Sequence, residues 1–159
     1  MSKVILDHTY CFNIDNVSFG NLPKETVIDL FRDGRISSAF LEEHIPLWYP
    51  KLKRVIGNKD HDHIGKDGRY YDAKNFTKNG LKFCPSSQIG AGRKINKEKA
   101  AESANKLIYI LCDIVEFPSI RIVFKNGVLL MKHYPSFTIP YKDRSNIFGE
   151  NPQPTKKPC

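Results

Sequence analysis

The chain lacks the features that mark secreted and membrane proteins. It has only four cysteines, scattered without a C-x-x-C pair: Cys11, Cys84, Cys112 and Cys159. This spacing fits neither a zinc site nor a disulfide framework, so we expect a reducing, intracellular setting. The sequence contains no run of 18 apolar residues, which is about the length needed to span a membrane. The apolar stretch at residues 4–6 is too short for a signal peptide. We therefore expect a cytoplasmic protein, whether a cell, a phage or a virus encodes it.

Repeats and low-complexity tracts are also missing. The 159 residues, 40% of them apolar, suit one domain with a real core, which we assign to residues 1–150. The tail 151–159 holds three prolines and two lysines and is expected to be disordered.

Positive charge is in excess. Twenty-five Lys and Arg face 17 Asp and Glu, which leaves a formal net charge of +8. Such a field is typical of proteins that bind polyanions. Because many basic proteins have no particular partner, the charge alone is weak evidence for nucleic-acid binding.

The apolar pattern predicts an α/β fold with a central mixed β-sheet flanked by helices. Helices are predicted from Asn21, the candidate cap, to Gly34, and over residues 37–48 and 96–106. An extended segment is expected within residues 3–19. Strands are predicted at 52–56, paired with 69–76, and at 107–115, 120–124 and 128–134. The last two are expected to form a hairpin, since Asn126-Gly127 is a strong turn signal.

The segment from 58 to 75 contains four acids, two histidines and three lysines. Asp72 and Lys74 are two residues apart on a predicted strand and should share a face. If the chain pairs across the turn at residues 65–68, Asp62 lies near Asp72. Converging carboxylates repel each other unless a proton or cation separates them. With a lysine alongside, this arrangement suits metal-assisted phosphodiester hydrolysis; the simpler interpretation is a solvated hairpin with a charged turn.

Asp62, followed ten positions later by Asp72-Ala73-Lys74, resembles the PD-(D/E)XK nuclease superfamily, which includes most type II restriction endonucleases. A helix precedes these residues and a helix plus strand follows, so the resemblance covers roughly residues 36–115. It implies a restriction-endonuclease-like fold and a Mg²⁺-dependent endodeoxyribonuclease. Asp62 and Asp72 would bind one or two Mg²⁺ ions, and Lys74 would orient or deprotonate the attacking water.

The chain departs from the superfamily pattern just before the first acid. His61 stands there instead of a proline, which makes Asp60 a rival for the role of Asp62. Glu42 or Glu43, on the preceding helix, would add a further carboxylate, as in some members of the superfamily.

Residues 60–64 also resemble the first strand of a ββα-metal (His-finger) nuclease of the phage Holliday-junction resolvase type. His61, His63 and Asn75 would then be the catalytic residues. Against this, such proteins carry zinc cysteines near the hairpin or a closing helix, whereas only Cys84 is nearby and residues 77–92 are rich in Gly, Pro and Ser. As surface residues, the histidines would be turn residues or phosphate contacts.

The loop at residues 77–94 is the predicted DNA-binding segment. Gln88 and Arg93 are candidates for reading bases. Hydroxyls and ammonium groups favour phosphates, and the candidates are Lys78, Lys82, Ser86, Ser87 and Lys94. For any one of them the alternative is an ordinary surface loop.

A double-strand cut usually takes two active sites, so a homodimer is expected. Two other functions stay open: a non-catalytic nucleic-acid-binding module, and an inert structural or viral accessory protein.

Overall fold

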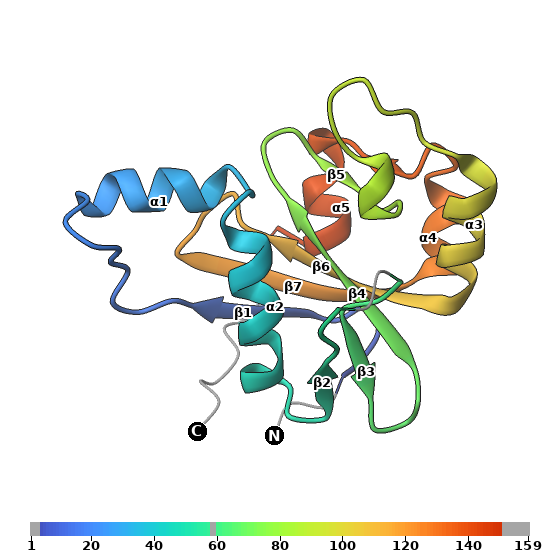
Figure 1. The fold of residues 1–159 in the computed structure, drawn as a ribbon, viewed down its shortest axis with the longest axis horizontal. Helices are drawn as coiled ribbons and strands as arrows, with labels where there is room; N and C mark the ends of the chain where they lie inside the picture. The colour runs from blue at the N-terminus through green and yellow to red at the C-terminus, as the bar shows by residue number, and fades with distance from the viewer. Residues whose placement is uncertain (1–3, 58–59, 151–159) are drawn as a thin grey trace.

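A mixed sheet runs through the protein, whose computed structural model describes residues 4–57 and 60–150 (Figure 1). Its strands are β1 (Thr9–Asn13), β2 (Leu52–Arg54), β3 (His63–Gly65), β4 (Tyr70–Phe76), β6 (Leu107–Asp113) and β7 (Ser119–Asn126). They lie in the order β1-β7-β6-β4-β3-β2. Strands β4 and β6 are parallel, and all other neighbours are antiparallel. The fold is therefore α/β with a mixed sheet, as predicted.

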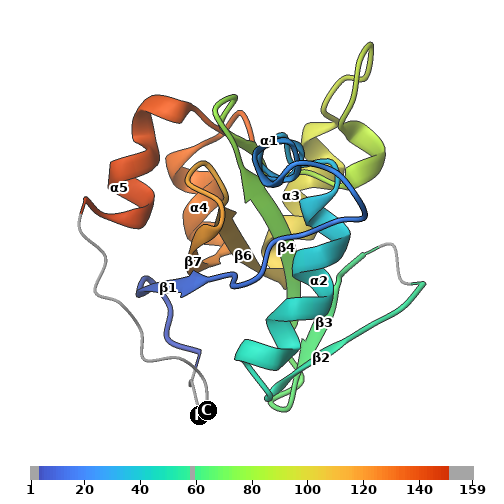
Figure 2. The same cartoon turned by 90° about the vertical axis from the view of Figure 1, so that its left-hand side faces the viewer.

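Helices cover both faces of this sheet (Figures 1 and 2). On one face lie α1 (Lys24–Arg32) and α2 (Ser37–Trp48), and on the other α3 (Lys97–Lys106), α4 (Gly127–His133) and α5 (Arg144–Phe148). A second, two-stranded sheet pairs β5 (Leu81–Lys82) with β8 (Thr138–Ile139), and two short 3-10 helices are Ser86–Gln88 and Tyr141–Asp143. Every residue of β6 is buried, as its apolar run predicts for a central strand.

Helix α3 makes the crossover between the parallel strands β4 and β6. Asn96 caps it, because its side chain accepts a hydrogen bond of 3.1 Å from the Lys99 amide. Ala100 and Ala104 are buried on its inner side. These small side chains allow close packing against α4. Residues within the helix and at its cap therefore set both where the crossover helix begins and which side of it is buried.

The predicted hairpin at Asn126-Gly127 is wrong, since residues 128–134 form helix α4 and its end rather than a strand. The Asn126 side chain accepts hydrogen bonds from the amides of Val128 (3.0 Å) and Leu129 (3.2 Å), which caps the helix. A Cβ on Gly127 would lie 2.1 Å from the Ala104 carbonyl oxygen. Glycine is therefore needed here for close approach to α3 and not for a turn.

Two further predictions need correction. Residues 52–56 do not pair directly with 69–76, because β3 lies between β2 and β4 and pairs with both. The Asn21 side chain does not cap α1, whose N-cap position is taken by Pro23. Helix α2 has the predicted bounds, and β1 lies within the predicted extended segment. The tail 151–159, predicted to be disordered, lies outside the described residues.

In the part of the chain that the structure describes, no helix is both long and apolar enough to cross a membrane.

Candidate functional site

Asp72 and Lys74 project from the same face of β4, as the period of a strand requires. The Lys74 Nζ atom lies 2.8 Å from Asp72 Oδ2, and the two side chains are only 10% and 14% exposed. Next on this face is Phe76, which belongs to the core under α3. The acid and the lysine therefore sit at the border between the core and the surface.

Asp62 approaches these two residues from the open edge of β4. Its main-chain N–H donates to the Tyr71 carbonyl (3.0 Å), and its Oδ2 accepts from the Ala73 N–H (2.9 Å). Strand β3 begins at His63, so beyond Tyr71 the edge of β4 has no strand partner in the described residues. The Asp62 carboxylate takes the place of that partner, which brings it beside Asp72.

The environment of Asp72 favours a bound proton or cation. Burial raises the pKa of this carboxyl, the Lys74 ammonium opposes the rise, and the neighbouring Asp62 carboxyl adds to it through repulsion and a hydrogen bond. The resulting pKa is about 6, against an ordinary value of 3.8. Asp62 and Asp72 thus form a pair of interacting carboxyl groups next to one lysine.

Asp62 and Lys74 line a cleft of about 720 Å³. One wall comes from the corner between α1 and α2, and the other from the loop around β5. The residues that line it are Asp33, Gly34, Arg35, Ser38, Glu42, Asp62, Ala73, Lys74, Asn75, Thr77, Asn79, Gly80, Leu81, Lys82, Ser86, Ile89, Gly90 and Ala91. Asp72 lies beneath this surface, and the exposed Asp60, the rival first acid, does not line it.

Of the two glutamates on α2, only Glu42 faces this cleft. Its Oε2 lies 3.1 Å from Nη2 of Arg54, at the end of β2. Glu43 also pairs with Arg54 but lines a different groove. Glu42 therefore lines the cleft, but its carboxylate pairs with Arg54 and, within the described residues, does not form a metal-binding cluster with Asp62 and Asp72.

The donor set fits Mg²⁺ only if water and substrate complete its shell. Among residues 4–57 and 60–150, no three His, Cys, Asp or Glu side chains converge as a ready metal-binding cluster. Mg²⁺ is usually held by one or two carboxylates, together with water and phosphate oxygens. The two interacting carboxyls of Asp62 and Asp72 match that requirement, since a cation between them would relieve their repulsion.

The residues of the alternative histidine site each contact different partners. His63 is fully buried, with Nε2 2.9 Å from the Glu42 carbonyl oxygen, and burial lowers the pKa of its ring. His61 packs on Tyr70, with ring centroids 4.3 Å apart. The Asn75 amide donates to Ser37 Oγ, Ser38 Oγ and the Gly34 carbonyl at the start of α2. His63 and Asn75 thus connect α2 to the sheet.

The predicted DNA-binding residues differ in what they contact. Gln88 Oε1 accepts a hydrogen bond of 2.8 Å from the Asn96 amide. Arg93 Nη1 donates to the Ser87 and Ile89 carbonyls within its own loop. Both candidates for reading bases therefore hold the loop together.

The other predicted DNA contacts lie on the surface. Lys82 and Ser86 line the cleft, and Lys78 lines a neighbouring pocket of about 270 Å³. Ser87 and Lys94 are exposed on the loop. Their positions leave them accessible to a phosphate backbone.

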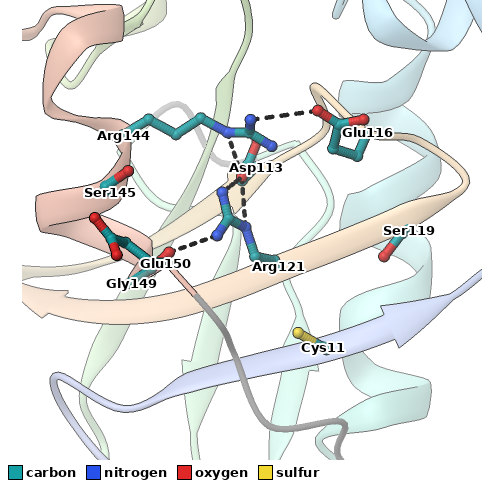
Figure 3. Close-up of a pocket in the computed structure, with 9 residues that line it drawn as sticks. All are labelled: Cys11, Asp113, Glu116, Ser119, Arg121, Arg144, Ser145, Gly149 and Glu150. Atoms are coloured by element: carbon teal, nitrogen blue, oxygen red, sulfur yellow. Dashed lines mark hydrogen bonds and ion pairs between the residues drawn. The ribbon is translucent and has the colours of Figure 1, made fainter.

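A second polar cluster, around Asp113, was missed by the sequence reasoning (Figure 3). Asp113 is 1% exposed at the end of β6, and its Oδ2 accepts from Nε of Arg121 (2.8 Å) and Nε of Arg144 (2.9 Å). Arg121 Nη1 also donates to the Gly149 carbonyl (2.7 Å). In the sequence, the signal for this cluster is an acidic residue, Asp113, at the end of an otherwise apolar strand. The cluster lines a cavity of about 440 Å³ and fastens α5 to the sheet.

No protein family, characterised protein or solved structure matches the chain. The interpretation of the cleft therefore depends on its own geometry and chemistry.

Proposed function

We propose that this protein is a Mg²⁺-dependent DNA endonuclease that hydrolyses phosphodiester bonds at Asp62, Asp72 and Lys74. The observation that carries the proposal is the contact between two interacting carboxyls and a lysine, of which Asp62 and Lys74 line an open cleft while Asp72 lies beneath its surface. Residues that lie ten and twelve positions after Asp62 meet it there. In a solvated turn the carboxyl of Asp72 would keep its ordinary pKa, whereas burial here raises that pKa to about 6, as is common at functional sites.

The arrangement of elements supports membership in the PD-(D/E)XK superfamily and a restriction-endonuclease-like fold. Helix α2 precedes the antiparallel strands β2, β3 and β4, and α3 with the parallel strand β6 follows. This is the helix, hairpin, and helix plus strand that the resemblance implies. Asp62 stands directly before β3, and Asp72 and Lys74 lie on β4, so the β3–β4 hairpin brings the three residues together.

In the proposed reaction, a water oxygen attacks phosphorus, the bond to the leaving oxygen breaks, and that oxygen takes up a proton. Asp62 and Asp72 would hold Mg²⁺, which when bound supplies Lewis-acid stabilisation of charge on the phosphate oxygens. The Lys74 ammonium would orient the water and offset negative charge in the transition state. Asp62 is fixed for this role by the Ala73 amide.

The substrate class follows from charge. The net charge of +8 attracts a polyanion, and Lys82 and Arg35 line the cleft itself. A homodimer is proposed for double-strand cutting, since each copy supplies one site for one strand.

Plasmid cleavage with Mg²⁺ or Mn²⁺, and with EDTA as control, tests the proposal. We expect the parent to cut, and Asp72→Ala and Lys74→Ala to lose at least about 100-fold in rate. Asp67→Asn is the matched control, because Asp67 is an acid of the same hairpin that pairs with Arg69 outside the cleft. A parent protein that binds DNA yet never cuts it would instead indicate a non-catalytic binding module.

The histidine alternative makes a different prediction. If His61 activated water, His61→Ala would be as damaging as Asp72→Ala. Under the acid–lysine proposal, His61→Ala has little effect because His61 packs on Tyr70 and does not line the cleft.

A further inference from the structure

Strand β2 forms one end of the six-stranded sheet, and its outer edge has no strand partner in the described residues (Figure 2). On its inner side, the Val55 N–H donates to the Asp62 carbonyl (2.8 Å). Because residues that bond to a neighbouring strand alternate with residues that face away, the main-chain groups of Leu52 and Arg54 point to the open side. The Leu52 N–H donates to the Tyr49 carbonyl (2.8 Å), which leaves the Leu52 carbonyl and both main-chain groups of Arg54 open to one more strand.

The side chains of β2 alternate between two faces of different character. Leu52 is buried in the core beneath α2, and the Arg54 guanidinium pairs with Glu42 of that helix. Lys53 projects from the opposite face, where Ile64 of β3 lies across from it in the register. The open edge therefore has α2 on one side and Lys53 on the other.

Three lysines share the face opposite α2, here called the lysine face: Lys51, Lys53 and Lys66. Each lies two positions from Lys53 or from Ile64, so strand alternation places all of them on one side. Lys51 and Lys66 are directly opposite each other, since the Lys66 N–H donates to the Lys51 carbonyl (3.1 Å). All three are exposed, and none forms an ion pair with a described residue. Like charges opposite each other are unfavourable, so this face favours an acidic partner.

A groove of about 720 Å³ follows the same edge. Pro46, Leu47 and Pro50 line it from α2 and the turn after that helix, and the lysine face lines its other side. Leu47 is 65% exposed although its side chain is large and apolar. A strand that lies along β2 would turn every second side chain toward the apolar flank of α2 and the others toward the lysines.

We propose that the edge of β2 is a docking site for an extended segment of a partner protein, in which acidic residues alternate with apolar ones. Pairing with the main chain of Leu52 and Arg54 supplies affinity, and the alternating side chains supply specificity. DNA offers phosphates to the lysines but no strand of N–H and C=O groups. A second copy of this edge is disfavoured, because pairing would bring two lysine faces together.

The proposed docking site does not depend on the proposed catalysis. None of the residues that line its groove belongs to the cleft at Asp62 and Lys74. Loss of cleavage activity would leave the docking site unaffected, and absence of docking would leave the cleavage tests unaffected.

NMR titration of the isotope-labelled protein tests the inference with synthetic peptides of about eight residues. The probe alternates valine with glutamate and is blocked at both ends. In the bound strand the valines lie opposite Leu52 and Arg54, so their N–H groups face β2 and those of the glutamates face away. A form N-methylated on every valine cannot donate to β2, whereas a form N-methylated on every glutamate is the matched control. Slower hydrogen exchange of the Arg54 amide reports pairing directly.

We expect the valine–glutamate peptide to bind and to slow exchange of the Arg54 amide at least about tenfold. N-methylated valines should lower the affinity at least about tenfold, and N-methylated glutamates less than about threefold. Lys53→Glu should weaken binding about three- to tenfold. Lys97→Glu makes the same charge change at an exposed lysine of α3 and should leave binding unchanged.

Other results would overturn the inference. Absence of peptide binding, or equal binding of both N-methylated forms, would show that the edge does not pair with a strand. Slower Arg54 exchange with a short DNA duplex, but not with the peptide, would assign the lysine face to nucleic acid. A parent protein that sediments as a dimer and becomes a monomer when peptide is added would show that a second copy occupies the edge.

Discussion

The Lys74 ammonium lies 2.8 Å from the Asp72 carboxylate, two residues earlier on the same strand, and neither side chain is more than 14% exposed. The lysine offsets part of the unfavourable burial of Asp72 but not all of it, since the pKa of this carboxyl is still raised to about 6. The site therefore holds a carboxylate in a place that is unfavourable for it. Such placement is common where a group serves binding or catalysis.

Asp72→Asn should stabilise the fold near pH 7.5. The folded protein holds a proton on Asp72 up to about pH 6, whereas the ordinary pKa is 3.8. Ionised Asp72 therefore destabilises the folded state progressively as pH rises from about 4 to 6, and fully above that. A tenfold change in an ionisation constant is worth about 1.4 kcal/mol, so the gain for the variant is at most about 3 kcal/mol.

Urea unfolding at pH 7.5 and pH 4 measures this effect. The gain should shrink toward zero at the lower pH, while cleavage is lost at both. Asp67→Asn serves as the control, because Arg69 lowers the pKa of Asp67 and its removal should not stabilise the protein. An equal effect of Asp72→Asn at both pH values would contradict the assigned burial of the charge.

Lys74→Met should reduce cleavage by at least about 100-fold and move its pH dependence. The lysine lowers the pKa of Asp72, so its removal raises that pKa above about 6 and shifts the acid limb of the rate profile to higher pH. Single-turnover rates between pH 5.5 and pH 9, with metal in excess, give the profile.

Lys82→Met is the matched control for Lys74→Met. Lys82 lines the same cleft but is exposed and forms no ion pair among the described residues. Its loss should weaken DNA binding and leave the acid limb in place. A parent-like limb in Lys74→Met would argue against the coupling of this lysine to Asp72.

The loop residues should separate into two groups when DNA binding is measured at several salt concentrations. Lys78→Ala, Lys82→Ala and Lys94→Ala should each reduce the salt slope by about 1, because each removes a phosphate contact. Gln88→Ala should leave the slope unchanged and lower stability by about 0.5–1 kcal/mol, since it removes the acceptor for the Asn96 amide. A change of sequence preference in Gln88→Ala would show instead that this residue reads bases.

Asp113→Asn should destabilise the protein by about 3–5 kcal/mol. The substitution removes the carboxylate that Arg121 and Arg144 share (Figure 3). Their side chains are only 14% and 18% exposed, so two largely buried charges lose their counter-charge. Chemical unfolding measures the change. Glu116→Gln is the comparison, because Glu116 touches Arg144 but is 65% exposed, and its loss should change stability by less than about 0.5 kcal/mol.

Local signals in the sequence were enough for several elements. The apolar spacing predicted α2 with its observed bounds, and the run from Leu107 predicted a strand buried on both faces. The i, i+2 spacing of Asp72 and Lys74 placed both on one face of β4. These features depend on the period of a helix or strand, which neighbouring residues set.

Asn126-Gly127 shows where local signals fail. The pair favours a hairpin in isolation, yet Gly127 packs against the carbonyl of Ala104, and Asn126 caps a helix. Turn and cap use the same side-chain chemistry, so only contact with α3 decides between them. The partner of His63 is likewise set by another element: its Nε2 donates to the Glu42 carbonyl, which Pro46 in α2 leaves without a helix N–H.

The order of residues by itself determined the strand that carries Asp72 and Lys74, the helix before it and the polar loop after it, because short-range periodicity encodes these. Only the tertiary structure decided that Asp62 fills the open edge of β4, that His63 donates a hydrogen bond to the Glu42 carbonyl, and that two arginines bind Asp113. Those arrangements satisfy or neutralise buried polar groups through partners far along the chain, and no local pattern specifies such partners.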